Sequence, residues 1–185
     1  MLIWALACAV AAVVLGIAVG EGPTAVDTWI AARLGGPSAL WDTLSLTTHP
    51  VATLSVIAAT VVLARRRLSV ALMAAAGPAI AVALNTWALK PAFGRVHGDH
   101  LAYPSGHTTA LAAILAVLVI AAGPRWIAVA LPLIAVAGTA IVGMGYHYAT
   151  DILGGALWAS AVVTFLWGTL ARRPRERDAT ENAAA

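Results

Sequence analysis

Long apolar runs, separated by short polar connections, restrict the fold of this chain more than any other feature. Each run holds roughly 18 to 22 mainly apolar residues, the length at which a helix crosses the ~30 Å hydrocarbon core of a bilayer. The 185 residues are 61% hydrophobic and only 10% charged, which is far more apolar than a soluble domain of this length. The sequence therefore predicts an all-α fold, a polytopic membrane helix bundle.

We expect about six transmembrane helices. They are predicted over Leu2–Val19 and over residues 44–64, 68–89, 108–122, 126–145 and 152–171. No Lys or Arg precedes the first run, so we interpret it as a helix and not as a signal peptide. Residues 21–42 mix apolar side chains with Gly, Pro and charge, which predicts an amphipathic stretch along one membrane face. Residues 1–171 are expected to form a single domain, and 172–185 a disordered cytoplasmic tail.

The arginines predict the orientation, because basic connections stay on the cytoplasmic side of a membrane. Six helices with both termini in the cytoplasm place eight arginines inside: Arg65, Arg66, Arg67, Arg125, Arg172, Arg173, Arg175 and Arg177. Only Arg33, Lys90 and Arg95 then lie outside. We therefore expect a multi-pass protein of the cell inner (plasma) membrane. The formal charge of +3 reflects this topology and does not indicate a nucleic-acid partner, and the single cysteine, Cys8, forms no intrachain disulfide.

The same orientation collects the histidines at the outer face, although the arginine argument did not use them. They are His49, His97, His100, His107 and His147. Ionisable side chains near membrane depth are costly, so a cluster of them indicates a functional site. Three outer segments contribute to it, and each lies at the end of a different predicted helix.

Each segment has an ordinary structural explanation when it is taken alone. Lys90 and Arg95 are typical of interface anchors, and the Pro-Ser-Gly-His turn that ends at His107 is typical of a helix start. His147 and Asp151, four residues apart, are close enough for a hydrogen bond with no reaction. Their combination is much less common by chance.

Together the segments form a coherent set for phosphoryl transfer. The carboxylate of Asp151 fixes one ring nitrogen of His147 in the protonated state and leaves the other free to attack phosphorus. A second histidine, His107, can protonate the departing oxygen, while Lys90, Arg95 and the N–H groups of the helix start stabilise the phosphoryl charge. Only one carboxylate lies near His147 in the sequence, so we expect no metal and no other cofactor.

These motifs resemble those of the type 2 phosphatidic acid phosphatase family, the lipid phosphate phosphatases, in its membrane branch. The central proline-serine-glycine-histidine motif is present at residues 104–107. The third motif, a histidine followed four positions later by aspartate, is present as His147 and Asp151, with Gly154 and Gly155 after it. The resemblance implies that His147 is a nucleophile forming a phosphohistidine, that Asp151 orients it and that His107 is the general acid. It also implies that Ser105 and Gly106 bind phosphate.

Two positions depart from the family pattern. The first motif of the family is a lysine followed, after six residues, by arginine and proline, but here His97 and Gly98 follow Lys90 at that distance. The arginine that normally lies six residues before the nucleophile is replaced by Ile141. We therefore expect Arg95 to carry most of the phosphate binding, with His97 and His100 as possible auxiliary groups.

The resulting hypothesis is a metal-independent phosphatase of a lipid phosphate or pyrophosphate that comes from the bilayer and is hydrolysed at the outer face. The substrate is expected to be a polyprenyl (pyro)phosphate or a phosphatidyl phosphate. Two alternatives stay open: a phosphotransferase that passes the phosphoryl group from His147 to another lipid or sugar, and a catalytically impaired family member that binds lipid phosphate. A haem subunit is disfavoured, because axial histidines face each other within a bundle, whereas these histidines are expected near the outer boundary of the membrane. The sequence does not predict the oligomeric state.

Overall fold

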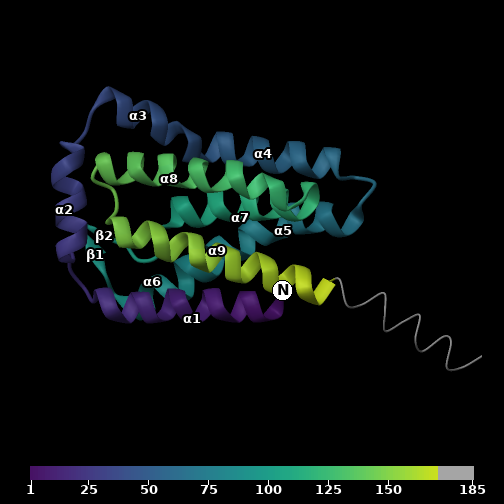
Figure 1. Cartoon of the computed structure of the whole chain (residues 1–185), viewed down its shortest axis with the longest axis horizontal. Helices are drawn as coiled ribbons and strands as arrows, with labels where there is room; N and C mark the ends of the chain where they lie inside the picture. Colours follow the sequence, from purple (N-terminus) through teal and green to yellow (C-terminus); the bar gives the residue numbers. More distant parts are fainter. Residues whose placement is uncertain (171–185) are drawn as a thin grey trace, which may run out of the picture.

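The computed structural model describes residues 1–170, which form an all-α membrane helix bundle and confirm the predicted fold class (Figure 1). The elements are α1 (Leu2–Val19), α2 (Ala25–Leu34), α3 (Ala39–Ser45), η1 (Leu46–Thr48), α4 (Pro50–Leu63), α5 (Leu68–Leu84), η2 (Asn85–Leu89), α6 (Lys90–Phe93), β1 (Val96–His97), β2 (His100–Leu101), α7 (Gly106–Ala122), η3 (Pro124–Trp126), α8 (Ile127–Gly143) and α9 (Ala149–Leu170). The predicted tail, residues 172–185, lies outside the described residues.

Within residues 1–170, five helical segments are long and apolar enough to cross a membrane. They are Leu2–Val19, Ala39–Leu63, Leu68–Phe93, Pro124–Gly143 and Ala149–Leu170. A sixth apolar helix, α7, has 17 residues. The predicted segments therefore exist, but the second one starts at Ala39 and not at position 44, because Ser38 caps the backbone N–H of Trp41 and opens the helix earlier.

Small residues allow the helices to pack closely around α9, which contacts α1, α5 and α7. The largest buried cluster combines Ala74, Ala81, Ala113 and Ala159 with Val163, and small side chains bring helix backbones together where lipid supplies no hydrophobic driving force. Many large apolar side chains point outward instead, as expected for a surface that faces lipid.

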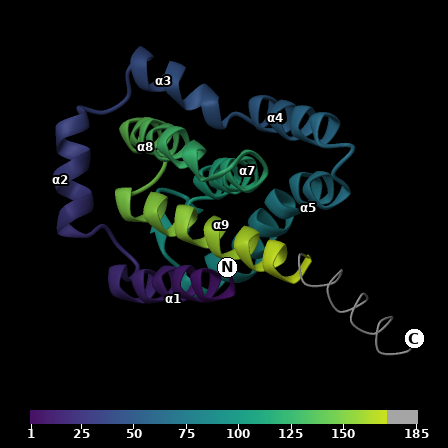
Figure 2. The same cartoon turned by 45° about the vertical axis from the view of Figure 1, so that its right-hand side comes forward.

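One end of the bundle carries most of the buried polar side chains. Helix α2 runs across this end, transverse to α1, α8 and α9, and the short β1–β2 hairpin lies beside it (Figures 1 and 2). Thr24 and Asp27 form a capping box that starts α2. The start of α7, the end of α6 and the α8–α9 connection meet at the same end. The three polar segments singled out in the sequence therefore come together.

Candidate active site

A cavity of about 550 Å³ opens at the polar end of the bundle. Its walls come from η1, α4, α6, β2, α7 and the α8–α9 connection. The lining residues are Thr48, Pro50, Thr53, Leu54, Lys90, His100, Gly106, His107, Ala110, Tyr146 and His147. Five of the sequence-predicted site residues thus line one space, and the rest of the wall is mainly apolar.

His147 lies in the connection between α8 and α9, where Gly145 adopts a φ of 75° and turns the chain back. The ring is 5% exposed, and its Nδ1 lies 3.5 Å from Oδ2 of Asp151. The contact is long for a hydrogen bond, and Nδ1 is buried without a hydrogen-bond partner. Burial lowers the pKa of His147 against the opposing influence of Asp151. The neutral imidazole is therefore favoured, with Nε2 as the nitrogen left for the cavity.

His107 lies in the first turn of α7 and faces His147 across the cavity. The two ring centroids are 6.1 Å apart and the rings are inclined by 73°. His107 comes from a helix and His147 from the α8–α9 connection, 40 residues apart in the sequence, so the bundle brings together two groups that can act on opposite sides of one reacting atom.

The start of α7 supplies backbone donors to the cavity through Gly106. Ser105 is the N-cap, and its Oγ accepts from the backbone N–H and the hydroxyl of Thr108. The side chain of Ser105 is fully buried and lies outside the cavity lining. Ser105 therefore caps the start of α7, and Gly106 is the residue of this turn that borders the cavity. The expected direct contact of Ser105 with phosphate has no geometric support.

The two glycines after Asp151 explain how the turn before α7 is held. The backbone N–H of Ser105 donates to the carbonyl of Asp151 at 3.0 Å, and a Cβ on Gly155 would lie 2.6 Å from the carbonyl oxygen of Ser105. A Cβ on Gly154 would enter the ring of Tyr103. Only glycine allows α9 to approach the turn this closely.

Lys90 is the only Lys or Arg among the residues that line the cavity. Its ammonium donates to the carbonyl of Leu101 on the hairpin. A π-helical turn, η2, precedes Lys90 and interrupts the α-helical repeat just before it. Such turns commonly mark functional positions because they rotate the residues that follow. Lys90 is therefore placed as expected from the sequence.

Arg95 does not lie where a phosphate-binding side chain was expected. Its guanidinium is completely buried and does not line the cavity. Both terminal nitrogens reach carboxylates: Nη1 lies 2.8 Å from Asp151 and Nη2 lies 2.7 Å from Asp27. Nη1 also donates to Thr150, while Nε and Nη2 donate to the carbonyl of Gly22. All five N–H donors of the guanidinium are thus engaged, so no donor remains for a phosphate group.

The two auxiliary histidines are separated by the structure. His100 lines the cavity, with its Nε2 3.0 Å from the carbonyl oxygen of Tyr146, and its ring centroid lies 5.6 Å from that of His147. His97 is absent from the lining and packs against the ring of Tyr148 at 4.4 Å. Ile141 is buried and is also absent from the lining.

Sequence reasoning missed Asp27 and Thr150. Asp27 is 1% exposed and accepts hydrogen bonds from Thr24, Arg95 and Thr150. Burial alone would raise the pKa of Asp27, but these hydrogen bonds outweigh it and hold the pKa below its usual range. The Thr24-x-x-Asp27 capping pattern signals the start of a helix, and nothing in it signals contact with α9.

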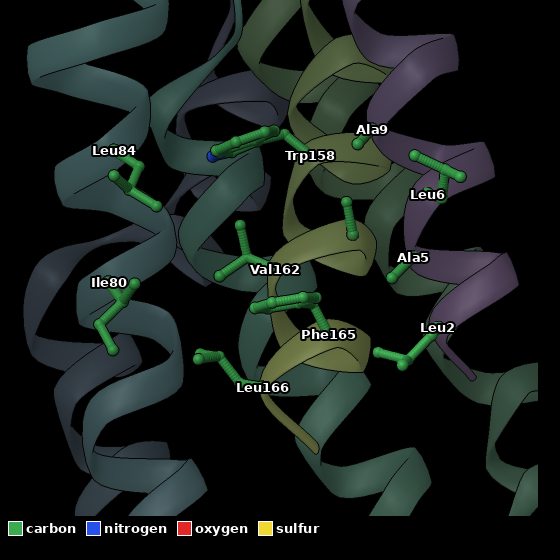
Figure 3. Close-up of a pocket in the computed structure, with 11 residues that line it drawn as sticks. Leu2, Ala5, Leu6, Ala9, Ile80, Leu84, Trp158, Val162, Phe165 and Leu166 are labelled. Carbon is green, nitrogen blue, oxygen red and sulfur yellow. The ribbon is translucent and has the colours of Figure 1, made fainter. Parts of the chain in front are cut away.

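A second cavity, of about 420 Å³, lies between α1, α5 and α9 and differs in kind (Figure 3). Leu6, Leu84, Val162 and Phe165 point toward it, and its lining includes no titratable or nucleophilic side chain. The indole N–H of Trp158 is already bonded to the carbonyl of Ala81. Of these two cavities, only the one around His147 is lined by titratable side chains.

Comparisons of the chain with protein-family models, with curated proteins and with solved structures gave no match.

Proposed function

We propose that the protein is a membrane lipid-phosphate or pyrophosphate phosphatase that works through a phosphohistidine. The observation that carries the proposal is the pair of histidines, His107 and His147, that share one cavity with the ammonium of Lys90 and the start of α7. The arrangement matches the motifs of the type 2 phosphatidic acid phosphatase family, which the sequence resembles.

In the first step, Nε2 of His147 attacks phosphorus and the bond between phosphorus and the leaving oxygen breaks. His107, protonated at the start, gives its proton to that oxygen. In the second step, a water molecule loses a proton to His107 and displaces the imidazole, which releases inorganic phosphate. Lys90 and the N–H groups at the start of α7 stabilise the charge of the equatorial oxygens in both steps.

A lipid substrate is supported by the way the cavity reaches the surface of the bundle. Leu54 of α4 lines the cavity and is also 63% exposed on the outer surface. Pro50 and Ala110 continue the apolar wall. A headgroup next to His147 can therefore leave its hydrocarbon chain beside α4, in contact with lipid.

The proposal is tested by phosphate release from purified protein in lipid nanodiscs. Four substrates are compared: polyprenyl pyrophosphate, phosphatidate, phosphatidylglycerol phosphate and a phosphoribosyl polyprenyl lipid. Phosphate release from at least one lipid that exceeds release from its water-soluble headgroup supports the proposal. No release from any of them, by protein that retains its helical content, refutes it. Trapping of ³²P on His147, followed by discharge to water or to a lipid acceptor, separates a phosphatase from a phosphotransferase.

The proposed orientation puts the cavity at the outer face of the cell inner membrane. Asp99, at the tip of the hairpin, has a fully exposed side chain, and the native Cys8 is buried. A Cys8→Ala/Asp99→Cys protein in intact cells should react with a membrane-impermeant maleimide. Reaction only after permeabilisation would place the site on the cytoplasmic side.

A further inference from the structure

The most completely bonded polar cluster in the described part of the chain lies behind His147 and not in the cavity. Arg95 lies between two buried carboxylates, Asp27 on α2 and Asp151 on α9, at 2.7 and 2.8 Å. Thr150 links them further, since it accepts from Arg95 at 2.6 Å and donates to Asp27 at 3.0 Å. The three charged side chains are at most 1% exposed, so solvent screens their interactions only weakly.

The two oxygens of Asp151 have different partners. Oδ1 accepts from Arg95, whereas Oδ2 accepts from the backbone N–H of Tyr148 at 2.9 Å and lies beside Nδ1 of His147. Arg95 thus fixes the rotation of the carboxylate and leaves Oδ2 turned toward the imidazole. The guanidinium alone, however, would cancel the negative charge that the imidazolium or phosphoimidazolium needs beside it.

We propose that Asp27 is a positioning residue for His147, which acts at one remove by holding Arg95 and by restoring a net negative charge behind the imidazole. Two carboxylates and one guanidinium leave one net negative charge in this cluster, next to Asp151. Helix α2 is then part of the machinery of the site, although it contributes no residue to the cavity wall. The catalytic meaning of this role rests on the proposed function, but the electrostatic effect on His147 does not.

Other charged or titratable groups also face His147. Asp151 approaches from α9, Lys90 from α6, His107 from α7 and His100 from β2. None of them is changed by a substitution at Asp27, so the effect of Asp27 can be measured against a constant background.

The experiment measures the protonation of His147 directly. Diethyl pyrocarbonate acylates neutral imidazoles, and mass spectrometry of the modified peptide reports the rate at His147 as a function of pH. In Asp27→Asn the guanidinium is balanced by Asp151 alone, so the imidazolium of His147 loses a favourable negative charge nearby. The pH midpoint of acylation at His147 should therefore fall by ~0.5–1 pH unit. Asp27→Asn/Arg95→Met restores one net negative charge, and its midpoint should return toward that of the wild type.

The matched control is Glu21→Gln, which removes one negative charge from an exposed position near the start of α2 and should leave the midpoint unchanged. If Asp27→Asn is recovered poorly, Asp27→Ser carries the same expectation, since it also removes the charge and keeps a polar group. An unchanged midpoint in folded Asp27→Asn or Asp27→Ser overturns the inference, because a merely structural role would lower yield or activity without moving it. A shifted midpoint in protein that hydrolyses no lipid phosphate would support this inference and refute the proposed function.

Discussion

The two polar clusters at the same end of the bundle differ in how many of their polar groups have hydrogen-bond partners. In the cluster around Arg95, the guanidinium donors and the carboxylates of Asp27 and Asp151 have partners, and the cluster excludes water. In the cavity cluster, His107 faces open space and Nδ1 of His147 has no hydrogen-bond partner. A buried polar group normally finds a partner, so the first cluster is complete as it stands, whereas the second borders open space.

This difference separates the two cations that the sequence assigned to phosphate binding, with Arg95 expected to carry most of it. Lys90 keeps an ammonium at the cavity, where three donors can rotate toward an anion, whereas Arg95 has no free donor. Arginine suits the buried position because its planar fork bonds two carboxylates at once. The cation at the cavity and the cation behind His147 therefore have different surroundings and different partners.

The largest effect should come from the nucleophile. We expect His147→Ala to reduce phosphate release to background, because no phosphohistidine can form, while Asp151→Asn retains some activity with a poorly oriented imidazole. His97→Ala is the control, since His97 lies on the same face but outside the cavity lining. Near-wild-type turnover by His147→Ala, measured with the best lipid substrate, would exclude the proposed mechanism.

The general acid should come next. General acid–base groups typically contribute a factor of about 10² to 10⁴ to the rate, so His107→Ala should lower kcat by a factor of that size. The loss should shrink with an aryl phosphate, whose leaving oxygen needs little protonation. An equal loss with both substrate types would instead assign His107 to binding.

Lys90 and Arg95 should separate catalysis from stability. Lys90→Met should lower kcat/KM by about 10² to 10³, the cost of losing one charge stabiliser, with little change in thermal unfolding. Arg95→Met leaves two carboxylates buried without their partner and should cost about 3–5 kcal/mol of unfolding free energy. Thermal melting in detergent and kinetics on the same preparations would test both. An Arg95→Met protein as stable as the wild type would show that the buried ion pairs contribute nothing to the fold.

The comparison also shows which parts of the site the sequence could predict. The spacing of four residues predicted that His147 lies close to Asp151. The lengths of the apolar runs predicted the apolar helices. The partner of Arg95 was not predictable, because Asp27 lies 68 residues away and reaches it only when α2 crosses the end of the bundle. The expected role of Arg95 was inferred from a charge count, and a count says nothing about which donors are already occupied.

The smallest expected effect is on the pH profile, and it tests whether the cavity needs a histidine cation. His147 must be neutral at Nε2 to attack, and burial lowers its pKa. The acidic limb of kcat/KM, which reports groups of the free enzyme, should therefore have its midpoint below the ordinary histidine value of about 6.5. Activity is lost as the pH falls through that midpoint, and it is lost again as the pH rises through the pKa of His107, which must be protonated to act as the general acid. If His97 supplied a missing charge, it would have to be protonated, and His97→Ala would then change the alkaline limb. Because His97 packs against Tyr148 outside the cavity lining, we expect wild type and His97→Ala to have superimposable profiles. An alkaline limb that changes in His97→Ala and persists in His100→Ala would show that a side chain outside the cavity wall in this structure enters it when substrate binds.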